Sequence, residues 1–471
     1  MIYAKKLTIN TGKTFTIGTN SNITIQNEVV NNGTFIIENN ANLIQVNNTT
    51  NTGNIIVKRN SNALSRLDYT MWSSPVAGSQ TLTNFSPLTT ATRFYTYDNT
   101  LGTNGLFAEV ASPSTTTFAT GTGYLIRMPN TAVEAPSTEK FNGMFTGVPN
   151  NGPKGFSSLT AGKYYAVGNP YPSTVSATAF LAGNTNIDGT LYFWRKKNNI
   201  NQGTSSTTSY ATWTTAGGVA NSGGGSTIEP SGILQVGQGF IVNTGTATIL
   251  NFENTMRIID NDDKILKTRK VVENNRVWLN LTNTSGAFSQ TLVAYMDNAT
   301  LGIDNGIDGK YINDSPIALT SNINNEEYVI QGRPSFDVSD VVALNFKTDL
   351  AGDYTIAVDH VDGLFATGQD IYLVDSKTGT ETNLKEGSYT FNTTAGVDNA
   401  RFSLKYQKTL KVEAPIFNEN NVVVYKNEGT LFVNSTGKTI KAIQVYDIQG
   451  KLISEQNNVK SNATSIKNIK A

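Results

Sequence analysis

Short apolar runs recur along residues 1–65, with polar turns between them. Each run holds three or four residues, and Asn, Gly and Thr fill the intervals, so that a run begins about every eight to twelve residues. The runs are LTI at 7–9, FTI at 15–17, ITI at 23–25, FII at 35–37, LIQV at 43–46 and IIV at 55–57. This spacing predicts a short β-solenoid-like stack, in which a rung buries its apolar face only against its neighbours. An antiparallel meander would give the same spacing, so both arrangements remain open.

Aromatic residues mark the strands expected in residues 66–256, and glycine and proline punctuate them. The clearest runs are RFYTYDN at 93–99, GYLIRM at 123–128, KYYAVGN at 163–169 and TLYFWRK at 190–196. The stretch 217–232 has almost nothing apolar to bury, and it reads as a long surface loop. We therefore expect a β-rich domain over 66–256, interrupted by this loop.

A second alternating block follows the charged segment 257–275, which is a plausible domain junction. Eight strand-like runs lie between residues 276 and 407, with turn signals every ten to fifteen residues: RVWLNLTN, QTLVAYMDN, EYVIQG, VVALNFKT, GDYTIAVDH, DIYLVDSKTG, GSYTFNT and ARFSLKYQ. This pattern predicts a β-sandwich of jelly-roll or immunoglobulin-like size over 257–410. Residues 411–471 add two hairpin-like pairs as a last small domain, so the whole chain is expected to be all-β.

Composition removes several classes of function. The chain has 471 residues, with 36 Lys plus Arg and 36 Asp plus Glu, and charged residues make up only 15% of it. A balanced chain has no global field to attract nucleic acid or an anionic membrane. Cysteine is absent, which excludes disulfides and thiolate metal sites. No stretch approaches the ~18–20 apolar residues of a membrane helix, so we expect no membrane span.

A glycine-rich loop offers candidate calcium ligands. The segment LGIDNGIDGKYIND at 301–314 carries Asp304, Asn305, Asp308 and Asp314, whose hard oxygen atoms suit Ca²⁺. It is not an EF-hand, because the third loop position is Gly306 and the twelfth is Ser315. Asx side chains also form turns by bonding to their own backbone, and that interpretation stays beside the calcium site. No other cofactor is expected.

Two tryptophans are candidate sugar-binding residues. Trp194 is followed by Arg195, Lys196 and Lys197, which would place hydrogen-bond donors beside the ring, and Trp213 lies on a neighbouring run. Strand tryptophans are more often part of the core. An exposed, flat ring at either position would favour glycan binding.

The sequence shows no catalytic constellation. His360 is the only histidine, and Asp359 and Asp362 beside it could orient its ring, but there is no G-x-S-x-G elbow. General acid–base or nucleophilic chemistry needs a positioned pair of groups, and no such motif is present. We expect a surface histidine near a strand end, and a protein that is not an enzyme.

The run IKAIQVYDIQGKLISEQ at 440–456 carries the most specific motif. Val445, Tyr446, Asp447, Gly450 and Lys451 form a V-Y-D-x-x-G-K core, and Ile443, Val445 and Leu452 are expected to point inward. This core resembles the C-terminal sorting domains of type IX secretion cargo. Upstream, MWSSPV, GNPYPS and VGQGFIVN resemble large bacterial surface proteins that share this domain.

The resemblance implies a cell-surface or secreted location in a Gram-negative bacterium, with export by the type IX secretion machinery. It also implies that the chain is truncated at both ends and that 411–471 is an incomplete sorting domain with an immunoglobulin-like fold. The role would be structural or adhesin-like, with surface polysaccharide or other glycans as further partners. The alternatives are a set of carbohydrate-binding modules, or the export tail of an enzyme that lies upstream.

Overall fold

The computed structural model confirms an all-β chain, with 51% of the chain in strands and 5% in helices. It describes residues 2–135, 137–195, 210–220, 228–261, 274–312, 315, 317–408, 422–436 and 438–467. The chain divides into two compact units, residues 1–408 (unit 1) and residues 409–471 (unit 2). No helix in the described part of the chain has the length and apolar character needed to cross a bilayer.

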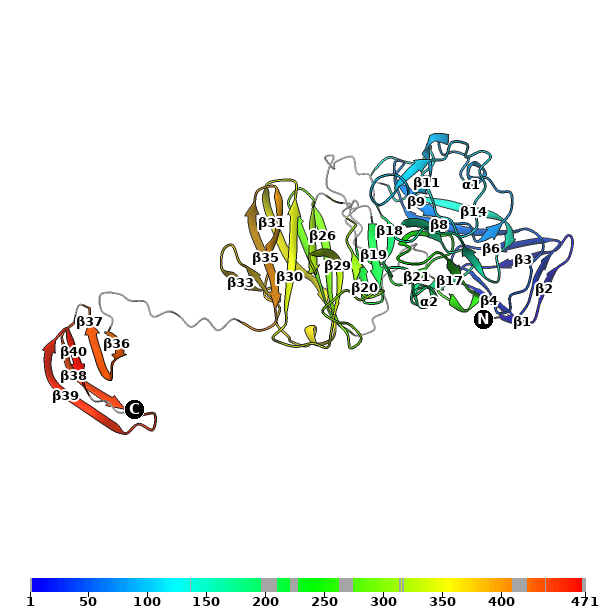
Figure 1. Cartoon of the computed structure of the whole chain (residues 1–471). Helices are drawn as coiled ribbons and strands as arrows, with labels where there is room; N and C mark the ends of the chain where they lie inside the picture. The colour runs from blue at the N-terminus through cyan, green and yellow to red at the C-terminus, as the bar shows by residue number, and fades with distance from the viewer. Residues whose placement is uncertain are drawn as a thin grey trace. The chain divides into compact units, whose positions relative to one another are not determined.

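Residues 2–63 form a three-sided coil of parallel strands (Figure 1). One side holds β1 (Ile2–Ala4), β4 (Asn22–Ile25) and β7 (Asn42–Gln45), the second holds β2 (Leu7–Ile9) and β5 (Val29–Asn31), and the third holds β3 (Thr14–Ile17), β6 (Thr34–Ile37) and β8 (Ile55–Ala63). Thr14 lies opposite Thr34, and Asn22 lies opposite Asn42, so a rung is twenty residues long at these positions. The parallel pairing is that of a stacked coil and excludes the antiparallel meander.

Amide side chains fix the rungs of the coil in register. Asn42 donates from Nδ2 to Oδ1 of Asn22 at 2.8 Å, and Asn47 donates to Asn27 in the same way at 2.7 Å. At one corner, a Cβ atom on Gly53 would lie 1.9 Å from the carbonyl oxygen of Asn31, and Gly53 has φ of 82°. Only glycine fits there, because the neighbouring rung approaches the bare backbone.

The coil continues directly into the next segment, because β8 pairs in parallel with β6 and antiparallel with β14 (Lys140–Pro149). Coil residues such as Phe35 and Val57 belong to the same core as Trp72, Phe94 and Phe145. This core therefore crosses residue 65. The other elements of this part are β9 (Tyr69–Trp72), β10 (Val76–Ala77), α1 (Leu82–Phe85), η1 (Ala91–Arg93), β11 (Phe94–Asp98), β12 (Leu106–Glu109) and β13 (Tyr124–Arg127).

Residues 154–258 form a five-stranded sheet of order β16-β22-β18-β19-β20, with smaller sheets beside it. The elements are β15 (Lys154–Phe156), β16 (Tyr164–Gly168), β17 (Thr174–Ser176), α2 (Ala177–Gly183), β18 (Leu191–Trp194), β19 (Tyr210–Thr214), β20 (Gly217–Val219), β21 (Ile233–Leu234), β22 (Gly239–Asn243), β23 (Leu250–Phe252), η2 (Asn254–Met256) and β24 (Arg257–Ile258). The expected surface loop at 217–232 is corrected at both ends. Residues 217–219 form the buried strand β20, because the bare backbone of Gly217 and Gly218 fits between packed layers. Pro230, near the other end of the stretch, is buried as well.

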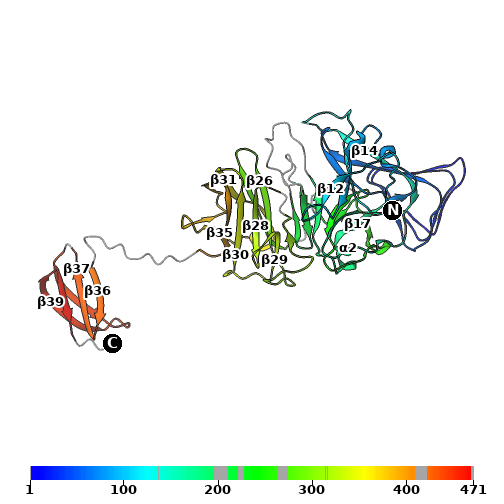
Figure 2. The same ribbon diagram turned by 45° about the horizontal axis from the view of Figure 1, so that its top comes forward.

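Residues 275–405 form a sheet that folds over its own core, the β-sandwich-like part of unit 1. Figure 2 shows β28, β30 and β35 side by side. The strand order is β33-β32-β35-β30-β28-β29-β26-β25-β31-β34, and β27 pairs with β29. Phe391 on end strand β34 packs against Phe402 on β35 with ring centroids 4.8 Å apart, so one end of the sheet meets the third strand from the other end across the core.

The bounds of these elements are β25 (Asn275–Asn283), β26 (Phe288–Tyr295), β27 (Gly309–Lys310), β28 (Ala318–Ile323), β29 (Glu326–Arg333), β30 (Val341–Thr348), β31 (Gly352–Val361), η3 (Gly363–Phe365), β32 (Tyr372–Asp375), β33 (Thr380–Asn383), β34 (Tyr389–Thr393) and β35 (Gly396–Lys405).

Unit 2 contains the two expected hairpins. They are β36 (Val422–Asn427) with β37 (Thr430–Ser435), and β38 (Ile440–Tyr446) with β39 (Leu452–Ser461); β40 (Ala463–Ile466) pairs with β37. Val433 is buried, at 5% exposed. Ile443 and Val445 are half-buried, but Leu452 is 45% exposed, so the inward orientation expected for Leu452 is wrong. A register shift between Val445 and Tyr446 moves the strand partners by one position, which changes the face that Leu452 occupies.

Candidate functional site

The predicted calcium ligands hold a turn together. Asp304 accepts hydrogen bonds from the backbone N–H and the hydroxyl of Thr300, at 2.5 and 3.0 Å. Asp308 accepts the N–H of Asp304 at 2.6 Å and that of Gly332 at 2.7 Å. Each of these carboxylate oxygens therefore already has a partner within the protein.

The surroundings of the turn strengthen this structural role. Asp308 is 3% exposed, and burial raises its pKa to about 6 although two backbone N–H groups favour the charged form. Asn305 donates to the carbonyl of Ile187 at 2.6 Å, which ties the loop to the segment before β18. Asp314 lies outside the described residues. The Asx-turn interpretation describes the observed bonds, and calcium binding stays a prediction.

Trp213 belongs to the core. Its ring is 6% exposed on β19 and lies against Gly232, where a Cβ atom would come within 2.5 Å of it. The glycan-binding interpretation required an exposed flat face, and Trp213 does not provide one. Burial of a large ring between the sheet and the segment before β21 is the physical reason.

Trp194 is half-buried at the end of β18, in a group that we call the aromatic cluster: Tyr97, Phe107, Trp194 and Tyr210. The Trp194 ring lies edge-on to Phe107 at 5.5 Å and to Tyr210 at 5.6 Å. Its indole Nε1 is buried and has no hydrogen-bond partner among the described residues. Strands of two different sheets, β11–β12 and β18–β19, thus bring four partly accessible rings together.

Of the three donors expected beside Trp194, Arg195 lies among the described residues. Arg195 is 8% exposed, and burial lowers its pKa to about 10, so its guanidinium does not reach solvent beside the ring. That part of the expectation is wrong, because Arg195 directly follows Trp194 at the strand end and neighbouring side chains point to opposite faces. Lys196 and Lys197 lie outside the described residues.

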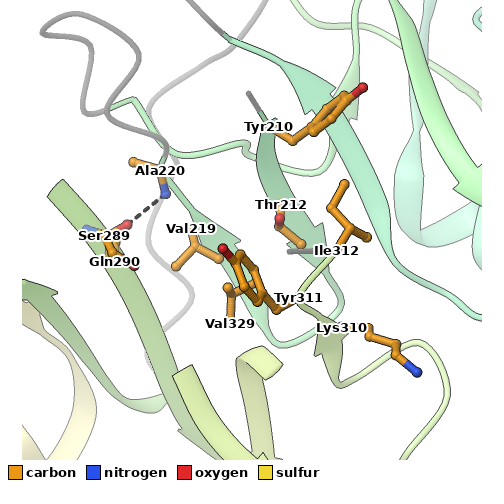
Figure 3. A pocket seen from close by; sticks show the side chains of 10 residues that line it. All are labelled: Tyr210, Thr212, Val219, Ala220, Ser289, Gln290, Lys310, Tyr311, Ile312 and Val329. Carbon is orange, nitrogen blue, oxygen red and sulfur yellow. Dashed lines mark hydrogen bonds between the residues drawn. The ribbon is translucent and has the colours of Figure 1, made fainter. Parts of the chain in front are cut away.

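A small cavity lies between β19–β20 and the sandwich strands β26 and β29 (Figure 3). Its lining includes Tyr210, Val219, Gln290, Tyr311 and Val329, and its volume is about 20 Å³. One water needs ~10–15 Å³ by this measure, so the cavity has room for about one water and none for a sugar ring.

The sorting motif forms a tight turn between β38 and β39. Oδ1 of Asp447 accepts the backbone N–H of Gln449 and of Lys451, both at 2.9 Å. Gly450 has φ of 82°, where a side chain would be strained, and Asp447 and Lys451 also pair through their backbones. Val445 is half-buried, whereas Tyr446 is 52% exposed beside the turn.

The sequence did not indicate one group of side chains that the fold assembles. Glu229, Asp359 and His360 place one ligand atom each within 4.8 Å of one another. Asp359 hydrogen-bonds to His360 at 2.7 Å, as expected for an orienting carboxylate, whereas Asp362 pairs with Arg276. Glu229 lies far from His360 in the sequence, within the stretch interpreted as a surface loop, so no local pattern could have joined them.

The fold defines an all-β protein of two units, and the comparisons follow the same division. The chain belongs to the family described as Domain of unknown function (DUF8693), whose model matches residues 1–406. Residues 410–471 match a second model, described as Domain of unknown function (DUF8694). The boundary between these matches falls beside the division between unit 1 and unit 2. No curated protein and no solved structure matches the chain.

Proposed function

We propose that this chain is a non-catalytic part of a secreted or cell-surface protein of a Gram-negative bacterium. In this proposal, unit 2 is the part that the type IX secretion machinery recognises, and unit 1 is the structural or adhesive part that is delivered. The observation that carries the proposal is the turn built by Asp447 and Gly450 in a unit compact by itself.

The exposed turn between β38 and β39 is the surface that a partner would bind. Tyr446 is 52% exposed and Ile448 is fully exposed, so the hairpin tip offers apolar side chains on a defined backbone. Exposed apolar residues held in a rigid conformation are typical of surfaces that bind a protein partner.

Replacing Asp447 by alanine tests this proposal in the full-length native protein. The variant leaves the N–H groups of Gln449 and Lys451 without their side-chain partner, so the tip loses its fixed conformation. We expect most of the protein to remain inside a host that has the type IX machinery, as measured by surface labelling and cell fractionation.

Asp337→Ala is the matched control. Asp337 forms the same kind of turn in unit 1, where it accepts the N–H and the hydroxyl of Ser339 at 2.8 Å. This variant should reach the surface in the normal amount. Equal surface delivery of both variants would remove the support for recognition through the turn.

The aromatic cluster favours a second function, carbohydrate binding. Partly exposed aromatic rings suit the apolar face of a sugar. We expect native unit 1 to bind a surface polysaccharide, and Trp194→Ala to weaken that binding by about tenfold, a loss of ~1.4 kcal/mol. Pull-down on a polysaccharide panel measures this.

Tyr3→Ala serves as the control, because Tyr3 is a 73% exposed ring on the coil. It should bind as the native protein does. If the native protein binds no polysaccharide of the panel, or if both variants bind equally, the cluster has only a packing role.

A further inference from the structure

The ring of His360 is held in one orientation. It lies next to the last residue of β31 and stacks on the ring of Trp278, with centroids 4.0 Å apart and an interplanar angle of 20°. Trp278 is 3% exposed and donates from Nε1 to the carbonyl of Gly218 at 2.9 Å. A buried, hydrogen-bonded indole therefore forms the floor beneath the imidazole, whose side chain stays 44% exposed.

A β-bulge places Asp359 beside His360. In the pairing of β25 with β31, Trp278 lies opposite His360 and Leu279 lies opposite Val358, so Asp359 is the extra residue. Neighbours in a regular strand point to opposite faces, but a bulge changes the direction of a side chain. Oδ2 of Asp359 consequently lies 2.7 Å from Nδ1 of His360.

A chain of amides holds Asp359 in turn. Asn280 donates to Oδ1 of Asp359 at 2.6 Å, and Gln290 donates to Oδ1 of Asn280 at 3.0 Å. Gln290 accepts the N–H of Ala220 at 2.7 Å, the bond drawn as a dashed line in Figure 3. Each link fixes the next, so the carboxylate has one position relative to the ring.

Glu229 completes the group from another part of unit 1. It lies just before buried Pro230, its side chain is 20% exposed, and its Oε2 is 3.7 Å from Nε2 of His360. With Asp359 accepting a proton from Nδ1, the lone pair of a neutral ring lies on Nε2, facing Glu229. The nearby guanidinium of Arg276 is hydrogen-bonded to Asp362 and also favours the charged form of Glu229.

We propose that the carboxylate of Glu229 and Nε2 of His360 bind Zn²⁺ or a divalent metal ion with similar ligand preferences. Asp359 is the positioning residue for the imidazole. Zinc bonds to nitrogen and carboxylate oxygen measure about 2.0–2.2 Å, and two such bonds bridge the 3.7 Å between these atoms at an open angle. A carboxylate that accepts the other ring N–H is the usual partner of a metal-binding histidine. Water supplies the remaining ligands on the exposed side of the ring.

The same three side chains also suit a protonated imidazole between two carboxylates. Burial raises the pKa of Glu229 to about 7, and although burial disfavours a charged ring, the bond to Asp359 and the charge of Glu229 raise the pKa of His360. Proton and metal therefore compete for one place. A test of metal binding therefore has to detect the state of the imidazole of His360 directly.

Titration with Zn²⁺ tests the site. The protein is the whole chain, purified without a histidine tag and stripped of metal with a chelator. His360 is the only histidine, so its imidazole resonances in a proton–nitrogen NMR spectrum report on this site alone. We expect one equivalent of Zn²⁺ to shift them and to raise the melting temperature, because the ion joins Glu229 to β31. Ca²⁺, which prefers oxygen ligands, should leave them unchanged.

Three variants and one control separate the roles. Glu229→Gln keeps the shape of the side chain and should weaken calorimetric Zn²⁺ binding at least about tenfold, and Asp359→Asn should weaken it by about 10–100-fold. His360→Ala should abolish it. Asp353→Asn, on the same strand with its carboxylate bonded to Asn392, should bind as the native protein does. Unshifted imidazole resonances at saturating Zn²⁺, or native affinity in His360→Ala, would overturn the proposal.

Discussion

Replacing Arg401 by methionine is expected to lower the free energy of unfolding of unit 1 by about 3–5 kcal/mol. The side chains of Arg401 and Asp375 are 3% and 0% exposed, and Nη2 of Arg401 lies 2.8 Å from Oδ2 of Asp375. The guanidinium also lies 4.4 Å from the ring centroid of Phe391. Methionine fills the same space, but it leaves a buried carboxylate without its counter-charge. The midpoint of chemical or thermal unfolding measures the loss.

The pH dependence of this loss identifies its cause. Burial alone would raise the pKa of Asp375, but the hydrogen bonds from Arg401 and Tyr389 outweigh burial and hold this pKa below its usual value. The native pair therefore stabilises above the unfolded pKa and loses that contribution as pH falls. In Arg401→Met, burial prevails and raises the pKa, so the deficit should shrink towards pH 4. The double variant with Asp375→Leu should recover part of the loss, and an equal deficit at pH 4 and pH 8 would contradict this account.

The second large effect is expected for Trp72→Ala, at about 3–5 kcal/mol. Trp72 is 1% exposed, and its ring contacts Phe85, Phe141 and Phe145 with centroids 5.3–6.0 Å apart. The cavity left by the indole lies in the core that also contains coil residues such as Val57. Amide hydrogen exchange should therefore accelerate both around Trp72 and in β4–β6 of the coil.

Leu88→Ala is the control for this experiment, because Leu88 is 58% exposed and close in sequence. It should change stability by less than about 0.5 kcal/mol. Unchanged protection of the coil in Trp72→Ala would show that the coil has a core of its own.

Apolar and aromatic runs predicted most of the sandwich strands. All eight runs interpreted as sandwich strands contain one, from β25 to β35, including β26, which is buried along its whole length. The short strands β27 and β33 were missed, and so was β28. The residues of β28 are buried on both faces, including Thr320 and Ser321, so its sequence shows neither alternation nor a continuous apolar run. The register of paired strands could not be predicted either. Leu452 was assigned to the wrong face because the register shift beside Tyr446 leaves no signal in the sequence.

The candidate sites depended even more on tertiary contacts. The Asp447 turn was visible because all its contacts are local. The sequence could not tell half-buried Trp194 from buried Trp213, since both lie on aromatic strands of one sheet. Glu229 and His360 come together because β31 contains a bulge and a distant segment packs beside it. Neither feature can be predicted from the spacing of residues in the sequence.

The amide pairs of the coil also limit how its gene can change. Asn22 with Asn42 and Asn27 with Asn47 are bonded across one rung of twenty residues. A single inserted residue would turn the following side chains to the opposite face and separate both pairs, because side chains alternate along a strand. The spacing between stacked residues is 21 from Ile2 to Ile23 and 22 from Leu7 to Val29, so the corners of this coil already differ in length from rung to rung. Changes of one or two residues are therefore expected to be accommodated at the corners and not within these paired strands.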